Sequence, residues 1–547
     1  MLERAIENWL TNAGEKQYQS AFCQVLMQQG HRVLRVSKHR STEEGKDVVS
    51  IDRKGQCNAY QLKAGPINVD AWRAIHGELI DLVSIPVKHP SVPRSAGHKA
   101  WLVTNGRLAD EVHQRIEDLN RDHQERGLGY AFLDVVERDG LLRDFAQAQR
   151  RFVPVEPDAL QRLLTIFLAD GAGQLDKTLL YRVLGEAFFD SPDLSPARAT
   201  NAVTASVVML SYLLDPFQRA ANHFAVFEAW MILSGLIEGF ALRTKIRSRV
   251  LNTTRAILLD EVLRALEALK EEALSRSNYL EGDIRGDGGL VYRARATLAL
   301  GASAALEVTK HSAESGYQVD PRLADRLERD WPVLWFWGDG SFPLHFAAIR
   351  CLELAGRQGT ALQLLTADLK AVVKSSTDGP GLPSVYYGVE PLLVYKAGLA
   401  PLERGAKEED FVGQSWSLHN LVLMCARRAM REVLESEWAR ISAVHLNWFE
   451  PSPGGFWAWR PEEGSNESRM FPAGQSWQEL RKLACEPVRP GPILKAAADR
   501  VLLYLLVRPE RALHTIVAAL DGRLERQPRG RKKSVKEDAS TPREADS

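Results

Sequence analysis

Residues 45–63 read GKDVVSIDRKGQCNAYQLK, and this stretch predicts a β-hairpin. The apolar residues within 48–51 favour a strand, and the Asp-Arg-Lys-Gly of residues 52–55 is typical of a turn. Residues 59–64 then have the composition of a returning strand. Two short strands separated by such a turn indicate an antiparallel pair, with its turn near the Lys-Gly dipeptide.

The predicted pairing brings an acid, an amide and an amine to one end of this hairpin. Asp47 falls opposite Leu62 or Lys63, to within one residue of register. Gln61 and Lys63 are two residues apart and therefore project from the same face of the strand, whereas Leu62 points into the core. We expect Asp47, Gln61 and Lys63 to converge there.

These three side chains suit metal-assisted hydrolysis of a phosphodiester bond. The Asp47 carboxylate is a ligand for a hard divalent cation, and the Gln61 side-chain oxygen or the Leu62 backbone carbonyl can supply a further oxygen. A cation held there can activate water, and the Lys63 ammonium can orient that water or stabilise phosphorane charge. The competing interpretation is a surface hairpin with ordinary polar residues, because this spacing also arises by chance.

Asp47 followed by Gln61-x-Lys63 resembles the D…QxK variant of the PD-(D/E)xK nuclease motif, as found in Mrr-type restriction endonucleases. The surrounding patterns agree with that family: a helix over 15–29, a strand over 31–36, and alternating helices and strands up to about residue 148. The resemblance implies a restriction-endonuclease-like α/β domain with a mixed central sheet flanked by helices. It also implies Mg²⁺ or Mn²⁺ as cofactor and nucleic acid, most simply DNA, as substrate.

Two neighbouring segments are candidates for accessory roles. In the family that the motif resembles, the first helix often carries a glutamate after an aromatic residue, and the matching pair here is Tyr18-Gln19. Gln19 is not an acid, so it is either an accessory residue of the site or part of a solvated helix face. Lys38, His39 and Arg40 precede the hairpin and could follow a phosphate backbone, although a solvated loop of mixed charge is the alternative.

Composition sets the broad class. At 547 residues, with 45% hydrophobic and 26% charged residues, the chain reads as a soluble protein of several domains. Its net charge of zero argues mildly against nonspecific coating of DNA. The five cysteines are scattered without a CxxC pair, which fits a reducing cytosol. The apolar run 224–242 contains Glu228 and Glu238, and so favours a buried helix over a membrane span.

From residue 154 strand patterns fade. We expect a nuclease-like domain over 1–153 and a large all-α bundle or solenoid over 154–522 that senses, assembles or binds substrate, with only short strand pieces near its aromatic islands. One helix is predicted over 417–445. The islands, 331–337 and 448–460, are expected to pack in the core, or alternatively to stack on bases or ligands. Residues 523–547 are expected to be disordered.

An Mrr-like domain joined to a long helical region resembles bacterial restriction or phage-defence effectors. The sequence therefore predicts a cytoplasmic endonuclease without membrane association, which forms a homo-oligomer or binds a partner protein through its helical region. The alternative is a non-catalytic helical scaffold or nucleic-acid-binding protein that carries an inactive nuclease fold. Zero net charge and Gln19 favour that alternative.

Overall fold

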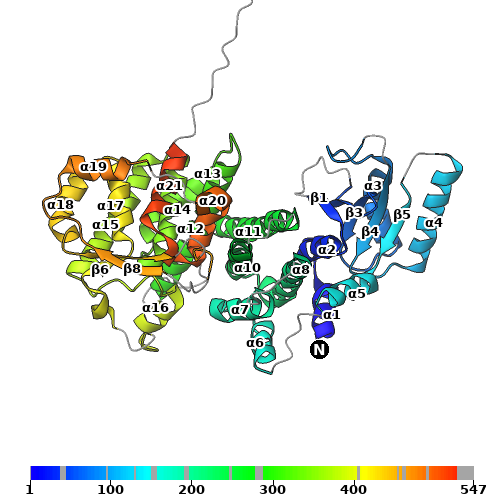
Figure 1. The fold of residues 1–547 in the computed structure, drawn as a ribbon, viewed down its shortest axis with the longest axis horizontal. Coiled ribbons are helices and arrows are strands. Elements are labelled where there is room, and N and C mark those ends of the chain that lie inside the picture. Colours follow the sequence, from blue (N-terminus) through cyan, green and yellow to red (C-terminus); the bar gives the residue numbers. More distant parts are fainter. Residues whose placement is uncertain are drawn as a thin grey trace, which may run out of the picture.

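A computed structural model describes most of the chain. The described residues are 2–36, 45–93, 97–127, 131–149, 157–189, 196–244, 249–276, 288–402, 407–451, 455–458, 464–487 and 492–525. Figure 1 shows an α/β unit at one end of the molecule, with helices extending from it to the other end.

The α/β unit is built on a mixed five-stranded sheet. Its strands are β1 (Arg32–Val36), β2 (Val48–Ile51), β3 (Cys57–Lys63), β4 (His98–Thr104) and β5 (Leu133–Val136). They lie side by side in chain order. β2 runs antiparallel to both β1 and β3, whereas β4 and β5 run parallel to β3. The predicted mixed sheet is confirmed, and so is the hairpin.

Helices cover both faces of this sheet. The helices are α1 (Leu2–Asn12), α2 (Glu15–Gln28), α3 (Val69–Ser84), α4 (Asp110–Glu125) and α5 (Arg138–Gln149). α3 and α4 cover one face, while α2 and α5 cover the other, with α1 beside α5. Successive strand residues serve opposite faces: Val48 packs in the cluster of α2 and α5, and Val49 in the cluster of α3 and α4.

The turn after β4 fixes the position of the backbone that follows β3. The Asn105 side chain accepts a hydrogen bond from the Gly65 N–H (2.7 Å) and donates to the carbonyls of Leu10 and Ala13. Gly106 lies so close to Gly65 that a Cβ at position 106 would overlap the Gly65 backbone. This junction joins α1, β3 and β4 at the edge of the sheet where β3 ends.

The remainder of the chain is mainly helical. Its helices are α6 (Pro157–Phe167), α7 (Lys177–Leu184) with a π-helical turn over Gly185–Phe189, α8 (Pro196–Leu213), α9 (Asp215–Arg219), α10 (His223–Thr244), α11 (Arg249–Ser275), α12 (Gly288–Ala313), α13 (Pro321–Asp330), α14 (Phe342–Leu354), α15 (Gln358–Thr377), α16 (Val389–Lys396), α17 (Leu418–Arg427), α18 (Arg431–Ile441), α19 (Trp477–Cys485), α20 (Pro492–Val507) and α21 (His514–Glu525).

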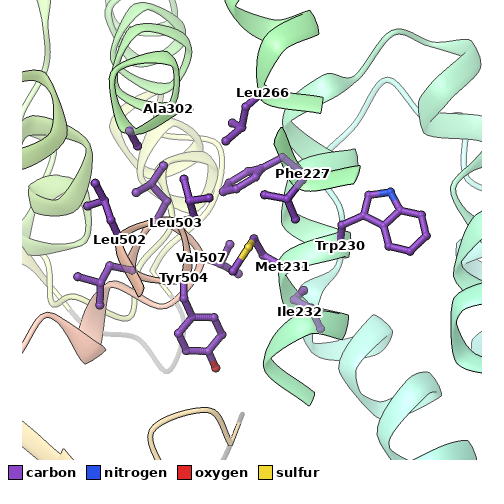
Figure 2. Close-up of a cluster of buried hydrophobic side chains, with 14 of the residues drawn as sticks. Phe227, Trp230, Met231, Ile232, Leu266, Ala302, Leu502, Leu503, Tyr504 and Val507 are labelled. Carbon is purple, nitrogen blue, oxygen red and sulfur yellow. The ribbon is translucent and has the colours of Figure 1, made fainter. Parts of the chain in front are cut away.

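α10 is the central helix of this region. Figure 2 shows Phe227 and Met231 of α10 directed towards Leu503 and Val507 of α20, with Trp230 on the other side of α10. Among the described residues, α10 is the one helix whose length and composition would let it cross a membrane, but it is buried within the protein. The prediction of a buried helix here is confirmed.

The acids of α10 are buried as ion pairs. Glu228 pairs with Lys177 at 2.8 Å, and Glu238 pairs with Arg255 at 2.8 Å and with Arg500. Buried charges of this kind are tolerated when each has a partner. The two glutamates therefore fasten α10 to α7, α11 and α20.

The helical region contains strands in one place, near the second aromatic island, where short strand pieces were predicted. β6 (Gln414–Ser415), β7 (His445–Pro451) and β8 (Gly464–Arg469) form a small three-stranded sheet beside the second aromatic island. The single helix predicted over 417–445 is two helices followed by β7. The break falls at Ala429, whose φ of 57° lies in the left-handed region and ends α17.

The aromatic islands pack internally. Trp337 is 6% exposed, and Phe456 and Trp457 lie against Tyr504 of α20, with ring centroids 5.6 and 4.8 Å apart. The predicted core role therefore holds for these aromatic side chains. In the C-terminal segment α21 continues to Glu525, three residues past the predicted end of the helical region, and residues 526–547 lie outside the described part.

One hydrophobic core crosses the predicted domain boundary. The apolar cluster that contains α2 and α5 continues through α8 and α10 to α20 and α21, whereas α3 and α4 enclose a separate, smaller cluster. Figure 1 shows α2, α5 and α8 at this junction. The two regions are therefore packed against each other through a shared apolar interface.

Candidate functional site

Asp47 lies immediately before β2 and is bonded to β3. The structure pairs Val48 with Tyr60, which sets Asp47 level with Gln61, one residue from the predicted register. The Asp47 N–H donates to the Tyr60 carbonyl at 2.8 Å, and the Asp47 carboxylate accepts the Leu62 N–H at 2.7 Å. Asp47 is only 9% exposed, so its carboxylate is held at one end of the hairpin.

The residues before Asp47 are fixed against α3. Gly45 has φ +68°, and a Cβ there would overlap the backbone carbonyl oxygen of Glu78. Lys46 is buried, and its amine donates to the Asp81 carbonyl at 3.2 Å. Glycine at position 45 thus satisfies both the backbone angle and the close approach that place Asp47 beside α3.

Lys63 and Gln61 lie on the same face of β3, as predicted, and both bind the carboxylate of Glu78. The Lys63 amine is 2.7 Å from Glu78 Oε2, and the Gln61 amide donates to that same oxygen at 3.2 Å. Glu15 Oε1 lies 3.7 Å from the Lys63 amine. Burial alone would lower the pKa of Lys63, but the hydrogen bond that Lys63 donates to Glu78 and the negative charges of Glu15, Glu78 and Asp47 raise it.

The side-chain oxygen of Gln61 is a candidate cation ligand. This oxygen is buried and has no hydrogen-bond partner in the structure, while the nitrogen of the same amide is bound to Glu78. A buried acceptor without a donor is costly, and a cation would relieve that cost. Within the described residues no group of three or more His, Cys, Asp or Glu side chains has metal-binding geometry, so any cation here would also need backbone oxygens and water.

Tyr18 of α2 is hydrogen-bonded to the last residue of β3. Its hydroxyl donates to the Lys63 carbonyl at 2.8 Å and lies 3.3 Å from the Val103 carbonyl. Burial raises the pKa of Tyr18 well above its usual value, and the negative charges of Glu15 and Asp47 raise it further. Tyr18 therefore stays protonated and acts as a donor that joins α2 to β3 and β4.

The remaining predicted residues divide into three cases. Gln19 is 3% exposed, so it is not part of a solvated helix face, and among the described residues it makes no hydrogen bond to Asp47, Gln61 or Lys63. Leu62 is buried, and its N–H faces Asp47. Lys38, His39 and Arg40 lie outside the described residues.

Sequence reasoning missed two acids. Glu78 lies on α3 next to the buried Leu79, and Glu15 is the first residue of α2, three residues before Tyr18. The sequence gives little indication of either acid, because the position of each relative to Lys63 depends on how its helix packs on the sheet. Only the predicted helix over 15–29, whose first turn precedes Tyr18, could have pointed to Glu15.

A surface depression lies at the opposite end of the hairpin. Its volume is about 490 Å³, and it is lined by Gln29, His31, Asp52, Arg53, Lys54, Gly55, Gln56 and Lys99. These residues surround the turn between β2 and β3, whereas Asp47 and Lys63 lie at the other ends of those strands. The depression is therefore separate from the candidate site.

No family model, curated protein or solved structure matches this chain. Its function has to be inferred from its own residues.

Proposed function

We propose that this protein is a metal-dependent nuclease that hydrolyses phosphodiester bonds, specifically a DNA endonuclease of the bacterial restriction or phage-defence type. The observation that supports this function is that Asp47, Gln61 and Lys63 lie together at one end of the β2–β3 hairpin, within a mixed sheet. These groups can together offer oxygen ligands to a cation and positive charge to a phosphate.

Asp47, Gln61 and Leu62 are the residues that would hold Mg²⁺ or Mn²⁺. The Gln61 oxygen is buried without a donor, and the Asp47 carboxylate is held nearby by the Leu62 N–H. The N–H and C=O of one strand residue point to the same side, so the Leu62 carbonyl would face Asp47 as well. When bound, such a cation supplies Lewis-acid activation of water and of the phosphoryl oxygen.

Lys63 would bind and stabilise the reacting phosphate. The surrounding acids raise its pKa, so its ammonium keeps its charge at neutral pH. Its side chain is 15% exposed and bound to Glu78, whose own side chain is 50% exposed. A phosphate that reaches Lys63 would compete with the more mobile Glu78 carboxylate, and the ammonium would then stabilise charge on the phosphorane.

A second candidate is the non-catalytic scaffold or nucleic-acid-binding protein with an inactive nuclease fold. Two observations favour it. The Lys63 amine is already bound to Glu78, and among the described residues no three His, Cys, Asp or Glu side chains are grouped so that they could hold a metal ion. Under either function we propose a cytoplasmic protein that assembles with itself or a partner protein. The five cysteines, all free thiols, agree with that compartment.

The decisive experiment measures Mg²⁺-dependent cleavage of plasmid DNA and of RNA. Asp47→Asn should abolish cleavage, and Lys63→Ala should slow it on the order of 10²–10³-fold. Gln61→Ala should be milder, because water can replace a neutral amide oxygen. Asp52→Asn is the matched control: it makes the same chemical change at the far end of the hairpin, where Asp52 accepts the Lys54 N–H.

Folding of every variant is checked by circular dichroism. If a folded Asp47→Asn protein cuts as fast as the parent, the site is not catalytic and the scaffold function takes its place. A parent protein that cuts neither DNA nor RNA with Mg²⁺ or Mn²⁺ would lead to the same conclusion.

A further inference from the structure

α2 is buried on two opposite faces. All residues from Tyr18 to Met27 are buried, including the polar Gln19, Ser20 and Gln24. Side chains three and four apart share a helix face, so Tyr18 and Phe22 face the sheet, and the Ser20 and Gln24 side chains face elsewhere. This helix separates the candidate site from the helical region.

The second face of α2 is hydrogen-bonded to α11. The Ser20 hydroxyl donates to the carboxylate of Glu261, and the Gln24 amide donates to the Thr254 hydroxyl at 3.1 Å. Glu261 is 6% exposed. Buried polar contacts of this kind fix the register of two helices, because a shift leaves each group without its partner.

Arg264 extends this contact to the first turn of α2. Its guanidinium pairs with Glu261 at 3.1 Å and donates to the Lys16 carbonyl at 3.0 Å. Burial raises the pKa of Glu261, and the Arg264 charge and the Ser20 hydroxyl oppose that change. Lys16 is the neighbour of Glu15, the acid 3.7 Å from the Lys63 amine.

We propose that Glu261 of α11 is a positioning residue for the candidate site, although it lies outside the α/β unit. Through Ser20 and through Arg264 it sets the position of the first turns of α2, and these place Glu15 beside Lys63. The active unit would then include α11 as well as the sheet. The catalytic meaning of this arrangement rests on the proposed nuclease function, whereas the positioning of Glu15 does not.

The test measures how close Glu15 lies to Lys63 in the full-length protein. A zero-length carbodiimide cross-link joins a carboxylate to a lysine amine that is nearly in contact with it, and mass spectrometry gives the yields of the Glu15–Lys63 and Glu78–Lys63 cross-links. Glu15→Gln should abolish the Glu15–Lys63 cross-link. Glu261→Gln and the smaller change Ser20→Ala should lower its yield several-fold relative to the Glu78–Lys63 cross-link, with slower Mg²⁺-dependent cleavage.

Glu271→Gln is the matched control. Glu271 lies on the same helix, is 55% exposed and pairs with Arg322, so this variant should keep the parent yield of the Glu15–Lys63 cross-link. An unchanged yield in both folded Glu261→Gln and folded Ser20→Ala would overturn the proposal, and so would a parent protein that forms the Glu78–Lys63 cross-link but none from Glu15. If the parent cleaves no nucleic acid but the cross-link yields change as expected, the nuclease function fails and the positioning of Glu15 stands.

Discussion

Tyr18 illustrates how one hydroxyl stabilises the edge of the sheet. Its bonds to the carbonyls of Lys63 and Val103 connect three elements in a buried place. Tyr18→Phe would leave these carbonyls without their donor, at a cost of about 1–3 kcal/mol in the free energy of unfolding. Urea denaturation measures this value. Tyr386→Phe, at a tyrosine that is 58% exposed, is the control and should change stability little.

Two glycines should respond in opposite ways to alanine. In Gly106→Ala the new methyl group would overlap the Gly65 backbone, so the turn after β4 must shift and stability should fall. Gly77 lies within α3 and has open space at its Cβ, so Gly77→Ala should stabilise by about 0.5–1 kcal/mol. Thermal unfolding of the two variants side by side measures both effects. A Gly106→Ala protein as stable as the parent would contradict the close packing.

The residue scale also shows what sequence could predict of the site. Asp47, Gln61 and Lys63 were found because a hairpin is a local structure, in which spacing along the chain determines position in space. Glu78 could not be found in this way, because its place beside Lys63 depends on how α3 packs on β3. The interpretation of Gln19 as a solvated residue failed because Gln19 is buried, in a helix that packs on both the sheet and the helical region.

At the scale of elements, a buried cluster of charges attaches α21 to α14 and α17. Asp521 pairs with Arg428 at 2.8 Å and Arg350 at 3.2 Å, and also with Arg427. Asp521→Asn would remove the acid that the three buried guanidinium groups share, and Glu353 would remain as a partner of Arg350 and Arg428. Loss of one partner from such a cluster costs about 3–5 kcal/mol. Chemical denaturation measures this cost, and Asp325→Asn, at an exposed surface pair, should cost far less.

The lowered pKa of Asp521 also makes the free energy of unfolding depend on pH. Burial alone would raise its pKa, but the guanidinium groups of Arg428, Arg427 and Arg350 hold the pKa well below its usual value. A carboxylate with a lowered pKa stabilises the fold at pH values above its unfolded pKa of about 3.9, and this stability is lost as pH falls further. Acid titration of stability should therefore be less steep below about pH 4 in Asp521→Asn than in the parent.

Helices and strands could be predicted where they are determined by residues close together in the sequence. The strands of the sheet alternate or run apolar over a few residues, and α2 ends two residues before Gly30, whose φ is +94°. The helix predicted over 417–445 was wrong because no glycine or proline marks the break at Ala429. Short strand pieces were predicted near the aromatic islands, but the positions of β7 and β8 were not, because the two strands pair across residues 452–463, a longer connection than a two-residue turn.

At the scale of the whole molecule, the shared core should make unfolding cooperative. The apolar cluster of α2 and α5 is continuous with that of α8, α10 and α20, so neither region can lose its packing without exposing the other. We expect differential scanning calorimetry of the full-length protein to show one main transition. Two well-separated transitions would contradict this expectation and would favour independent domains with a boundary near residue 153.

The position of α20 between α10 and α12 has a consequence during protein synthesis. Leu503 and Val507 face Phe227 and Met231, so the centre of the helical region stays open until residues 492–507 have left the ribosome. Translation at about 5–20 residues per second leaves the face of α10 that packs on α20 uncovered for at least ten seconds or so after α10 emerges. A nascent chain in this state is a natural substrate for chaperones, and slowing translation after α10 should increase aggregation.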